Sequence, residues 1–485
     1  MSELARNARF VGSFVLHALA EDPRRLLTLA ARRAAIGVRA AGNRRRAVTG
    51  RQATPMPAVT PSRVPTLGTV PSAASPRVLH HLTNSLPFTQ SGYTLRSHAV
   101  LRAQADAGLT VHATTRAGYP LTIGAITARH TSTLDGIVYE HLIPAAVRRG
   151  RARRLDEAAT LLAAAATRTG AEVIHATTPA ATGEVARAAA ERLGLPWVYE
   201  VRGLPEETWA ASHATPEERE AAARSQRFAA LRDAETDLAT AADAVVTLSG
   251  TMRDELVGRG VPAERIHVVP NAVAQSLLEA EHPDPRSARD LLGLPVEGLL
   301  VGAVSSLVGY EGQDTILRTV ALLRSRGVDA RALIVGDGVS RPSLVGLAAD
   351  LGLTEHTILP GRVPASAAST YVAALDVVLV PRRPDRVTHL VTPLKPVEAM
   401  AIGRPVIASN LPALVEACGG AGVLVDPDDV DGWADAVQRL LDDPRWYADR
   451  VTAGSAVATD RSWTRMTEIY TEVYASATTR AEVNR

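Results

Sequence analysis

Short apolar runs alternate with longer amphipathic segments from residue 77 to residue 441. The apolar runs are rich in Val, Leu, Ile and Ala and end at Gly, Pro, Ser or Asn, a pattern that indicates buried strands. The segments between them are rich in Ala, Arg, Leu and Glu and favour helices. Such alternation is typical of a parallel, doubly wound sheet. The strands expected in the first half are 77–82, 110–113, 173–176, 197–201, 244–248 and 267–271.

The alternation stops at residues 282–285, His-Pro-Asp-Pro, and then starts again. We therefore expect two Rossmann-like domains, residues 73–281 and 282–455, with a ligand cleft between the carboxyl ends of their sheets. Residues 456–485 are expected to form a C-terminal helix, from Trp463 to Ala475, followed by a polar tail. The strands expected in the second half are 299–304, 332–335, 357–359, 377–380, 405–408 and 422–425.

Residues 1–72 form a separate extension with its own pattern. An apolar stripe comes first, then an arginine-rich segment, then a Pro/Ser/Thr/Ala-rich linker over 47–76. The apolar run 10–16 is short for a signal peptide, so we prefer an uncleaved amphipathic segment. Two interpretations of the arginines stay open: a basic segment on an anionic membrane surface, or a partly disordered tail. The stripe consists of Phe10, Val11, Phe14, Val15, Ala18 and Leu19.

Charge and cysteine content narrow the class of protein. The net charge is +2, which argues against a general nucleic-acid binder. The single cysteine, Cys418, excludes an internal disulfide framework and fits a reducing compartment. No apolar run reaches the roughly 18 residues of a transmembrane helix. We expect a cytoplasmic protein, peripheral on the inner face of the plasma membrane if the extension binds lipid.

The segment from Thr392 to Met400 has the chemistry of a helix start that receives an anion. Thr392 is a good N-cap, and Pro393 then falls where a helix tolerates proline. The free amides of a first turn form a phosphate site. Lys395 places a cation there, against the helix dipole, which makes sense if an anion also binds. Glu398, three residues further on, is suited to a diol. The alternative is a capped surface helix with a Lys–Glu pair.

Two arginines, Arg382 and Arg383, follow the expected strand 377–380 and precede this helix. The planar fork of a guanidinium donates two parallel hydrogen bonds to phosphate. Other polar turns also end expected strands, although each alone is more often an ordinary strand-to-helix turn. They are Ser91-Gly92-Tyr93, Ser305-Ser306, Gly336 and Gly361-Arg362-Val363. Arg202, beside Glu200 at the end of the expected strand 197–201, suits an anionic or hydroxylated ligand, and a structural ion pair is the equally weighted alternative.

Several familiar sites are absent from the sequence. There is no complete G-x-G-x-x-G with a downstream acid, which disfavours a dinucleotide oxidoreductase. Histidine and carboxylate spacings typical of metal sites are missing, and no G-x-S-x-G or Cys–His arrangement indicates a nucleophile. We expect neither a metal nor a cofactor.

In order and spacing, three segments resemble the retaining glycosyltransferases of family 4, which have the GT-B fold. The resemblance runs from about residue 77 to residue 444. It implies an α/β protein of two Rossmann-like domains, a nucleotide-sugar in the C-terminal domain and most of the acceptor in the N-terminal domain. The segments are Val268-Val269-Pro270-Asn271-Ala272-Val273, residues 333–338 (LIVGDG) and residues 398–409 (EAMAIGRPVIAS).

The resemblance also implies roles for individual residues. Glu398 takes the place of the glutamate that binds the nucleotide ribose, and the turn from Gly361 to Val363 matches the segment beside the base. Lys395, Arg382, Arg383 and Arg202 are the candidate catalytic residues, and Ser91, Gly92 and Tyr93 lie on the acceptor side. The candidate donor-binding residues are Glu398, Thr392, Leu394, Ser305, Ser306, Gly336, Gly361, Arg362 and Val363.

The chain departs from the family pattern at four places. An Arg and a Lys that many members place on the donor pyrophosphate are replaced by Ser305 or Ser306 and by Glu311. The first glutamate of the family's E-x7-E motif is Leu390, and a frequent histidine is Arg202. We favour relocation of the lost charge to Lys395 and the two arginines, within a TPLKPxEAMA segment that resembles a branch of the family.

Two functions of different class follow. The first is a metal-independent hexosyltransferase that uses a nucleotide-sugar and makes a polysaccharide, a glycolipid or a cell-envelope glycan. The second is a catalytically inactive GT-B partner protein, which the missing cations would allow. Transfer or hydrolysis of a labelled UDP- or GDP-sugar separates the two.

Overall fold

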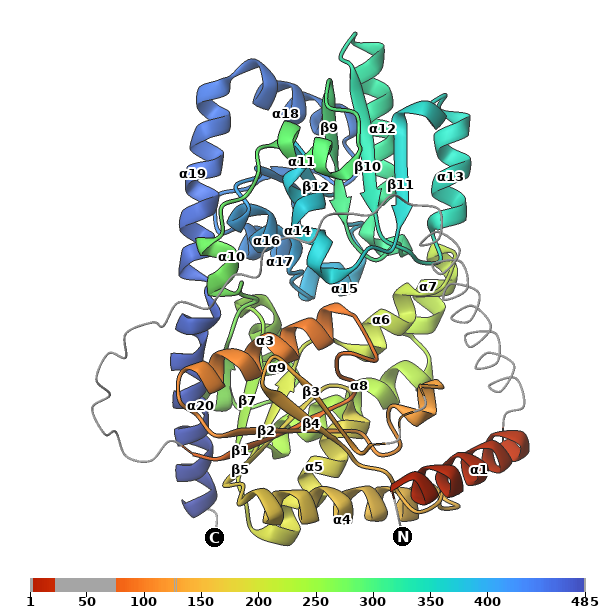
Figure 1. The fold of residues 1–485 in the computed structure, drawn as a ribbon, viewed down its shortest axis with the longest axis vertical. Coiled ribbons are helices and arrows are strands. Elements are labelled where there is room, and N and C mark those ends of the chain that lie inside the picture. Colours follow the sequence, from red (N-terminus) through yellow and green to blue (C-terminus); the bar gives the residue numbers. More distant parts are fainter. Residues whose placement is uncertain (1–2, 22–75, 126, 128, 484–485) are drawn as a thin grey trace, which may run out of the picture.

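The computed structural model describes residues 3–21, 76–125, 127 and 129–483, which form two domains with one sheet each (Figure 1). The first sheet has eight strands in the order β3-β4-β2-β1-β5-β6-β7-β8. All neighbouring strands are parallel except β3 and β4. The strands are β1 (Val78–Leu82), β2 (Val111–Thr115), β3 (Thr131–Leu134), β4 (Ile137–His141), β5 (Val173–Thr177), β6 (Trp197–Val201), β7 (Ala244–Thr247) and β8 (Ile266–Val268).

The second sheet is wholly parallel, in the order β11-β10-β9-β12-β13-β14. The order reverses at β9, and in doubly wound sheets ligands bind at such a switch point, outside the carboxyl ends of the strands. The strands are β9 (Leu299–Val304), β10 (Ala330–Val335), β11 (Thr357–Gly361), β12 (Val377–Val380), β13 (Val406–Ser409) and β14 (Val423–Val425).

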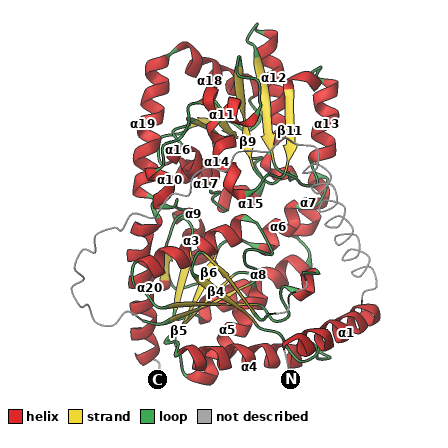
Figure 2. Cartoon of the chain, viewed as in Figure 1, coloured by secondary structure: helices red, strands yellow, loops and turns green. Residues whose placement is uncertain are grey.

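Both faces of each sheet are covered by helices (Figure 2). In a strand, successive side chains point to opposite faces. Accordingly Leu79 packs with residues of α4, α5 and α8, while its neighbour Val78 packs with residues of α3 and α20. Because both faces are buried, the strands read as continuous apolar runs. The helices of the first domain are α3 (Gly92–Asp106), α4 (Arg151–Thr169), α5 (Ala180–Leu193), α6 (Pro205–Ala211), α7 (Pro216–Ala223), α8 (Gln226–Ala241) and α9 (Gly250–Gly258).

The chain crosses the domain junction twice. After α10 (Gln275–Glu279) it builds the second domain, and α19 (Pro444–Asp460) then leads into α20 (Trp463–Val483), which packs on the first sheet (Figure 1). Val273 and Ser462 pair as a β-bridge where the two crossings meet. The remaining helices are α11 (Pro285–Leu292), α12 (Gln313–Ser325), α13 (Arg341–Asp350), α14 (Ala365–Ala373), α15 (Arg386–Leu390), α16 (Lys395–Ala401), α17 (Pro412–Cys418) and α18 (Val430–Asp442).

The two-domain α/β fold predicted from sequence is confirmed, with local differences. The hairpin β3–β4 was not predicted, although Asp135-Gly136 between the strands is a strong hairpin-turn signal. The segment 216–242, rich in Ala, Arg and Glu, forms two helices, α7 and α8, because Ser225 caps the start of α8 by accepting a hydrogen bond from the Phe228 amide. The expected polar tail is helical as far as Val483.

The amphipathic segment at the start of the chain is a helix, α1 (Glu3–Glu21). Its apolar stripe faces the protein: Phe10 is 3% exposed and packs with Leu121 and Ile143, with Phe14 partly buried beside it. This part of the stripe is therefore not a free membrane-binding face. The arginine-rich segment lies outside the described residues. Among the helices that the structure describes, none is long and apolar enough to cross a membrane.

Candidate active site

A close approach of two loops places Glu311 beside the end of β12. Gly309, Tyr310 and Glu311 form the 3-10 helix η3, and Gly312 follows with φ +67. A Cβ on Gly312 would lie 1.8 Å from the carbonyl oxygen of Pro381. Only glycine therefore fits at this position, which fixes η3 against the residues that follow β12.

Glu311 bridges two of the cations that the sequence singled out, Arg382 and Lys395. Its Oε1 accepts a hydrogen bond from Nη2 of Arg382 at 2.8 Å, and its Oε2 contacts the ammonium of Lys395. Glu311 and Arg382 are 8% and 7% exposed. Burial alone would raise the pKa of Glu311, but Arg382 and Lys395 outweigh it and lower the pKa to about 2. The cluster thus holds two cations and one carboxylate.

Lys395 has a special place in the chain, because it is the only lysine among 485 residues. Burial lowers the pKa of Lys395, and Arg382 adds to that effect, whereas Glu311 and Glu398 oppose it. An ammonium, unlike a guanidinium, shifts its pKa readily when buried. The charge of Lys395 therefore depends on its carboxylate neighbours.

The helix start predicted at Thr392 is wrong, and the structure shows why. α16 begins at Lys395, and Leu394 is its N-cap without a side-chain hydrogen bond. If Thr392 were the N-cap, its carbonyl would need the amide of residue 396, which is a proline. The carbonyl of Thr392 instead accepts a hydrogen bond from Nδ2 of Asn271 at 2.9 Å. Glu398 lies in the first turn, and burial raises the pKa of this carboxyl, with Lys395 opposing.

Arg383 does not join this cluster. Its guanidinium is 48% exposed and pairs with Asp314 at 3.0 Å. It lines a separate groove of about 420 Å³, which α7 of the first domain borders through Arg219. The other lining residues are Asp314, Thr315, Arg318, Pro384, Asp385, Pro427, Asp428 and Val430.

The remaining donor-side candidates lie at the carboxyl ends of β9, β10 and β11. Nε2 of Gln313 donates to Oγ of Ser305 at 2.9 Å and to the carbonyl of Ser306 at 2.8 Å. The amide of Gly336 donates to the carbonyl of Gly361 at 3.0 Å. Arg362 and Val363 follow directly after β11. These turns lie at the carboxyl edge of the second sheet.

On the first domain, Arg202 forms a structural ion pair, which was one of the two alternatives. It contacts Oε2 of Glu200 at 2.7 Å and donates to Oγ of Ser97 at 2.6 Å. Burial would raise the pKa of Glu200, but Arg202 and Arg96 hold it well below its usual range. Arg202 is 3% exposed, so a contact with substrate would require this network to rearrange.

Ser91, Gly92 and Tyr93 open α3. Ser91 is the N-cap and forms a capping box with Thr94, and Gly92 is the first helical residue. Tyr93 is 50% exposed, and its carbonyl accepts a hydrogen bond from Nη1 of Arg202 at 3.3 Å. Of the three, Tyr93 therefore has the side chain most open to an acceptor.

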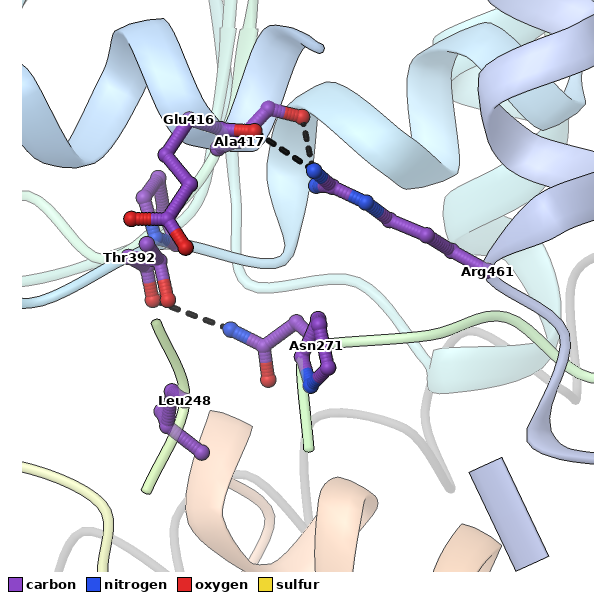
Figure 3. A pocket seen from close by; sticks show the side chains of 8 residues that line it. Leu248, Asn271, Thr392, Glu416, Ala417 and Arg461 are labelled. Carbon is purple, nitrogen blue, oxygen red and sulfur yellow. Dashed lines mark hydrogen bonds between the residues drawn. The ribbon is translucent and has the colours of Figure 1, made fainter. Parts of the chain in front are cut away.

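The domains are joined around Asn271, a residue that the sequence analysis did not single out (Figure 3). Nη1 of Arg96 donates to Oδ1 of Asn271 at 3.0 Å, which leaves the amide of Asn271 directed at Thr392. A small cavity of about 10 Å³ lies here, also lined by Glu416 and Arg461. The position of Asn271 in the segment Val268–Val273 was a sequence signal, but its hydrogen-bond partners Arg96 and Thr392 lie far away along the chain.

Two carboxylate contacts secure the junction further out. Oε1 of Glu416 accepts from the amide of Gly250 at 2.6 Å, at the start of α9. Arg386 of α15 pairs with Glu207 at 2.6 Å and with Glu255 at 2.8 Å. Among the described residues, no group of three or more His, Cys, Asp or Glu side chains is arranged to hold a metal ion.

Two family models match the chain, one on each domain. Residues 91–272 match the Glycosyl transferase 4-like domain, and residues 298–443 match Glycosyl transferases group 1. The chain is 31% identical over 308 residues to a D-inositol 3-phosphate glycosyltransferase of Acidothermus cellulolyticus, covering 61% of this chain and 65% of that protein. It is also similar to a GDP-mannose-dependent alpha-(1-6)-phosphatidylinositol monomannoside mannosyltransferase of Mycolicibacterium smegmatis, with 34% identity over 224 residues, 45% of this chain and 58% of the relative. The match thus spans less than two thirds of either relative.

Solved structures share the fold. HepE of Anabaena, solved in complex with UDP-glucose, superposes with a TM-score of 0.62 at 19% sequence identity, covering 82% of this chain and 99% of HepE. At this identity the likeness concerns the arrangement of the two domains.

Proposed function

The chain belongs to the family 4 glycosyltransferases of the GT-B fold, and from that premise we propose that it transfers a hexose from a nucleotide-sugar to a hydroxyl acceptor. The observation that carries the proposal is the convergence of Arg382 and Lys395 at the carboxyl edge of the second sheet, with Glu398 one turn along α16. Two cations suit a diphosphate, and a neighbouring carboxylate suits a ribose diol.

On the donor side, Lys395 and Arg382 bind the phosphates, and Glu398 accepts hydrogen bonds from the ribose. The turns at Ser305, Gly336 and Gly361 provide short side chains and backbone groups beside the nucleotide. Fixed cations stabilise the negative charge that develops as the nucleoside diphosphate leaves. Arg383, which lies on the other groove, is a weaker candidate for this role.

We propose a retaining transfer that needs no metal ion, since the family resemblance favours retention and the two cations supply the charge stabilisation. The acceptor oxygen forms a bond to the anomeric carbon while the bond from that carbon to the phosphate oxygen breaks. The acceptor's proton moves to the leaving phosphate oxygen on the same face. Closure of the two domains over the donor limits hydrolysis.

The acceptor is proposed to be a glycan, a glycolipid or another cell-envelope precursor, bound on the first domain near Tyr93. The names of the relatives support a hydroxylated, phosphate-bearing acceptor, because one acts on an inositol phosphate and another on a phosphatidylinositol mannoside. A peripheral location at an anionic membrane surface would suit a lipid-linked acceptor, and the basic segment before residue 47 is the part that would bind there.

The test is transfer of a radiolabelled sugar from UDP- and GDP-hexoses, preceded by a thermal-shift screen of donors, since a ligand that binds the native state raises its stability. We expect one donor class to bind. We expect Lys395→Ala to reduce transfer at least about a hundredfold, because the substitution removes a positive charge that stabilises the leaving diphosphate. If no UDP- or GDP-sugar binds or turns over, the inactive partner protein becomes the better explanation.

A further inference from the structure

Glu311 lies between Arg382 and Lys395, the two cations proposed to bind the donor diphosphate. Where the resemblance to family 4 leads us to expect a cation, this chain has a buried carboxylate between these two side chains. The loop that carries Glu311 is fixed at both ends: Gly312 contacts Pro381, and the amide of Arg383 donates to the carbonyl of Tyr310 at 3.0 Å. The carboxylate is therefore held in place by the backbone.

The two cations differ in how firmly they are held. Arg382 has a second anchor, because its Nη1 donates to the carbonyl of Val391 at 2.7 Å. For Lys395, whose side chain is 18% exposed, the hydrogen-bond partner in the structure is Glu311. The groups whose charge acts on Lys395 are Glu311 on η3, Arg382 after β12 and Glu398 on α16 itself. Glu311 contacts the ammonium directly, whereas Glu398 is one turn away.

The composition of the chain makes this arrangement specific. Lys395 is the only lysine beside 52 arginines, so the only side-chain ammonium is the one that meets Glu311. An arginine stays charged when buried, whereas a buried lysine loses its proton more readily unless a negative charge lies close to it.

We propose that Glu311 is a positioning residue for the donor: its carboxylate keeps Lys395 charged and beside Arg382, so that both cations meet the donor diphosphate together. This inference rests on the proposed function for its ligand. Glu311 itself is not expected to touch the reacting atoms.

The first experiment needs no ligand. Reductive methylation with ¹³C-formaldehyde labels only Lys395 and the amino terminus, so the titration of Lys395 can be followed by NMR. We expect Glu311→Gln to lower the pKa of Lys395 by about one unit or more. Glu355→Gln, which neutralises an exposed carboxylate in the 3-10 turn before β11, is the matched control and should leave the titration unchanged. An unchanged Lys395 in Glu311→Gln overturns the inference.

The second experiment measures function in the unmodified protein. We expect Glu311→Gln to bind UDP or GDP nearly as wild type at pH 6.5 and to lose binding and kcat/KM steeply toward pH 9. Changing Lys395→Arg in the Glu311→Gln background should restore a flat profile, because the guanidinium stays charged. An equal loss at every pH, without rescue by arginine, would mean that Glu311 is merely structural.

The outcomes separate the two proposals. A wild-type protein that binds neither UDP nor GDP and transfers no sugar overturns the proposed function and the donor role of Glu311 with it, even if Lys395 titrates as expected. Donor binding by wild type with a pH profile that Glu311→Gln does not alter overturns only the inference about Glu311.

Discussion

The side-chain amide of Asn271 donates a hydrogen bond to the backbone carbonyl of Thr392 across the domain junction, over 2.9 Å. Asn271 ends the first domain, and Thr392 lies in the loop that enters α16. Arg96 fixes the amide by donating to its oxygen. This hydrogen bond thus helps to set the position of α16 relative to the first domain.

Asn271→Ala should therefore reduce kcat/KM about tenfold, the equivalent of one net hydrogen bond of about 1.4 kcal/mol. The loss arises from a less well-defined domain orientation, so binding of free UDP or GDP should change little. Steady-state kinetics and calorimetry measure the two. Asn410→Ala, at an exposed asparagine, is the control, and an effect no larger than the control's would count against the role of Asn271.

Glu398→Gln should weaken the donor more than it slows chemistry. A carboxylate offers one acceptor oxygen to each hydroxyl of a ribose diol, whereas an amide replaces one of these oxygens by an NH2 donor, so roughly 1.5–3 kcal/mol is at stake. We expect KM for the nucleotide-sugar to rise about tenfold or more with kcat nearly unchanged. A 2′-deoxyribose donor should show a smaller difference between the variant and wild type. Equal sensitivity to both donors would remove Glu398 from the ribose site.

Glu235 should make stability depend on pH near neutrality. Burial raises the pKa of Glu235 from 4.5 to about 7, and its partners are the Tyr199 hydroxyl and the amide of Ala180. A raised pKa means that the folded state holds the proton more tightly. The contribution to stability is full below pH 4.5 and is lost as pH rises through 7, by about 3 kcal/mol in all.

Glu235→Gln keeps the protonated shape without the titration. Urea unfolding should show the variant equal to wild type near pH 4.5 and more stable by about 2–3 kcal/mol at pH 8.5. Glu264→Gln, at an exposed site, should follow the wild-type curve. A wild-type stability that does not fall between pH 5 and 8 contradicts the assignment.

Glu416 should contribute to the stability of the domain junction. Its carboxylate accepts from the amides of Gly250 and Thr251 at 2.6 and 3.1 Å and from the Thr251 hydroxyl at 3.0 Å. Charge-assisted bonds of this kind contribute about 2 kcal/mol. Glu416→Ala should lower the free energy of unfolding by about that amount. Glu297→Ala breaks the exposed pair with Arg286 and should cost at most about 1 kcal/mol; equal losses would refute the interpretation.

The arginine-rich segment of the extension can be tested for membrane binding, although the apolar stripe of α1 packs against the protein. Replacing Arg44, Arg45 and Arg46 with glutamine should weaken binding to vesicles containing anionic lipid by about 1 kcal/mol per charge and leave donor binding intact. Vesicle sedimentation at two salt concentrations measures this. Binding to neutral vesicles should be the same for both proteins, and undiminished binding to anionic vesicles would remove the membrane proposal.

The pattern of apolar runs predicted the fold well because each strand of a doubly wound sheet is buried on both faces. The expected strands 197–201, 299–304 and 377–380 agree with β6, β9 and β12 at both ends. The start of α16 was predicted wrongly. The prediction rested on Thr392 as N-cap and Pro393 as first helical residue, but Pro396 has no amide hydrogen to bond the carbonyl of Thr392. Arg202 was read as a ligand residue or a structural pair, and no local signal distinguished them.

The sequence alone determined the two-domain architecture, the family and a short set of candidate cations for a phosphate site, because these follow from local periodicity and from residue chemistry. The tertiary structure decided which of them act together. Glu311 is separated from Arg382 by 71 residues and from Lys395 by 84. They meet because parallel strands bring their carboxyl ends to one edge, and Gly312 lets two loops touch there. What looked in the sequence like the loss of a cation is, in the fold, the carboxylate that holds the only lysine.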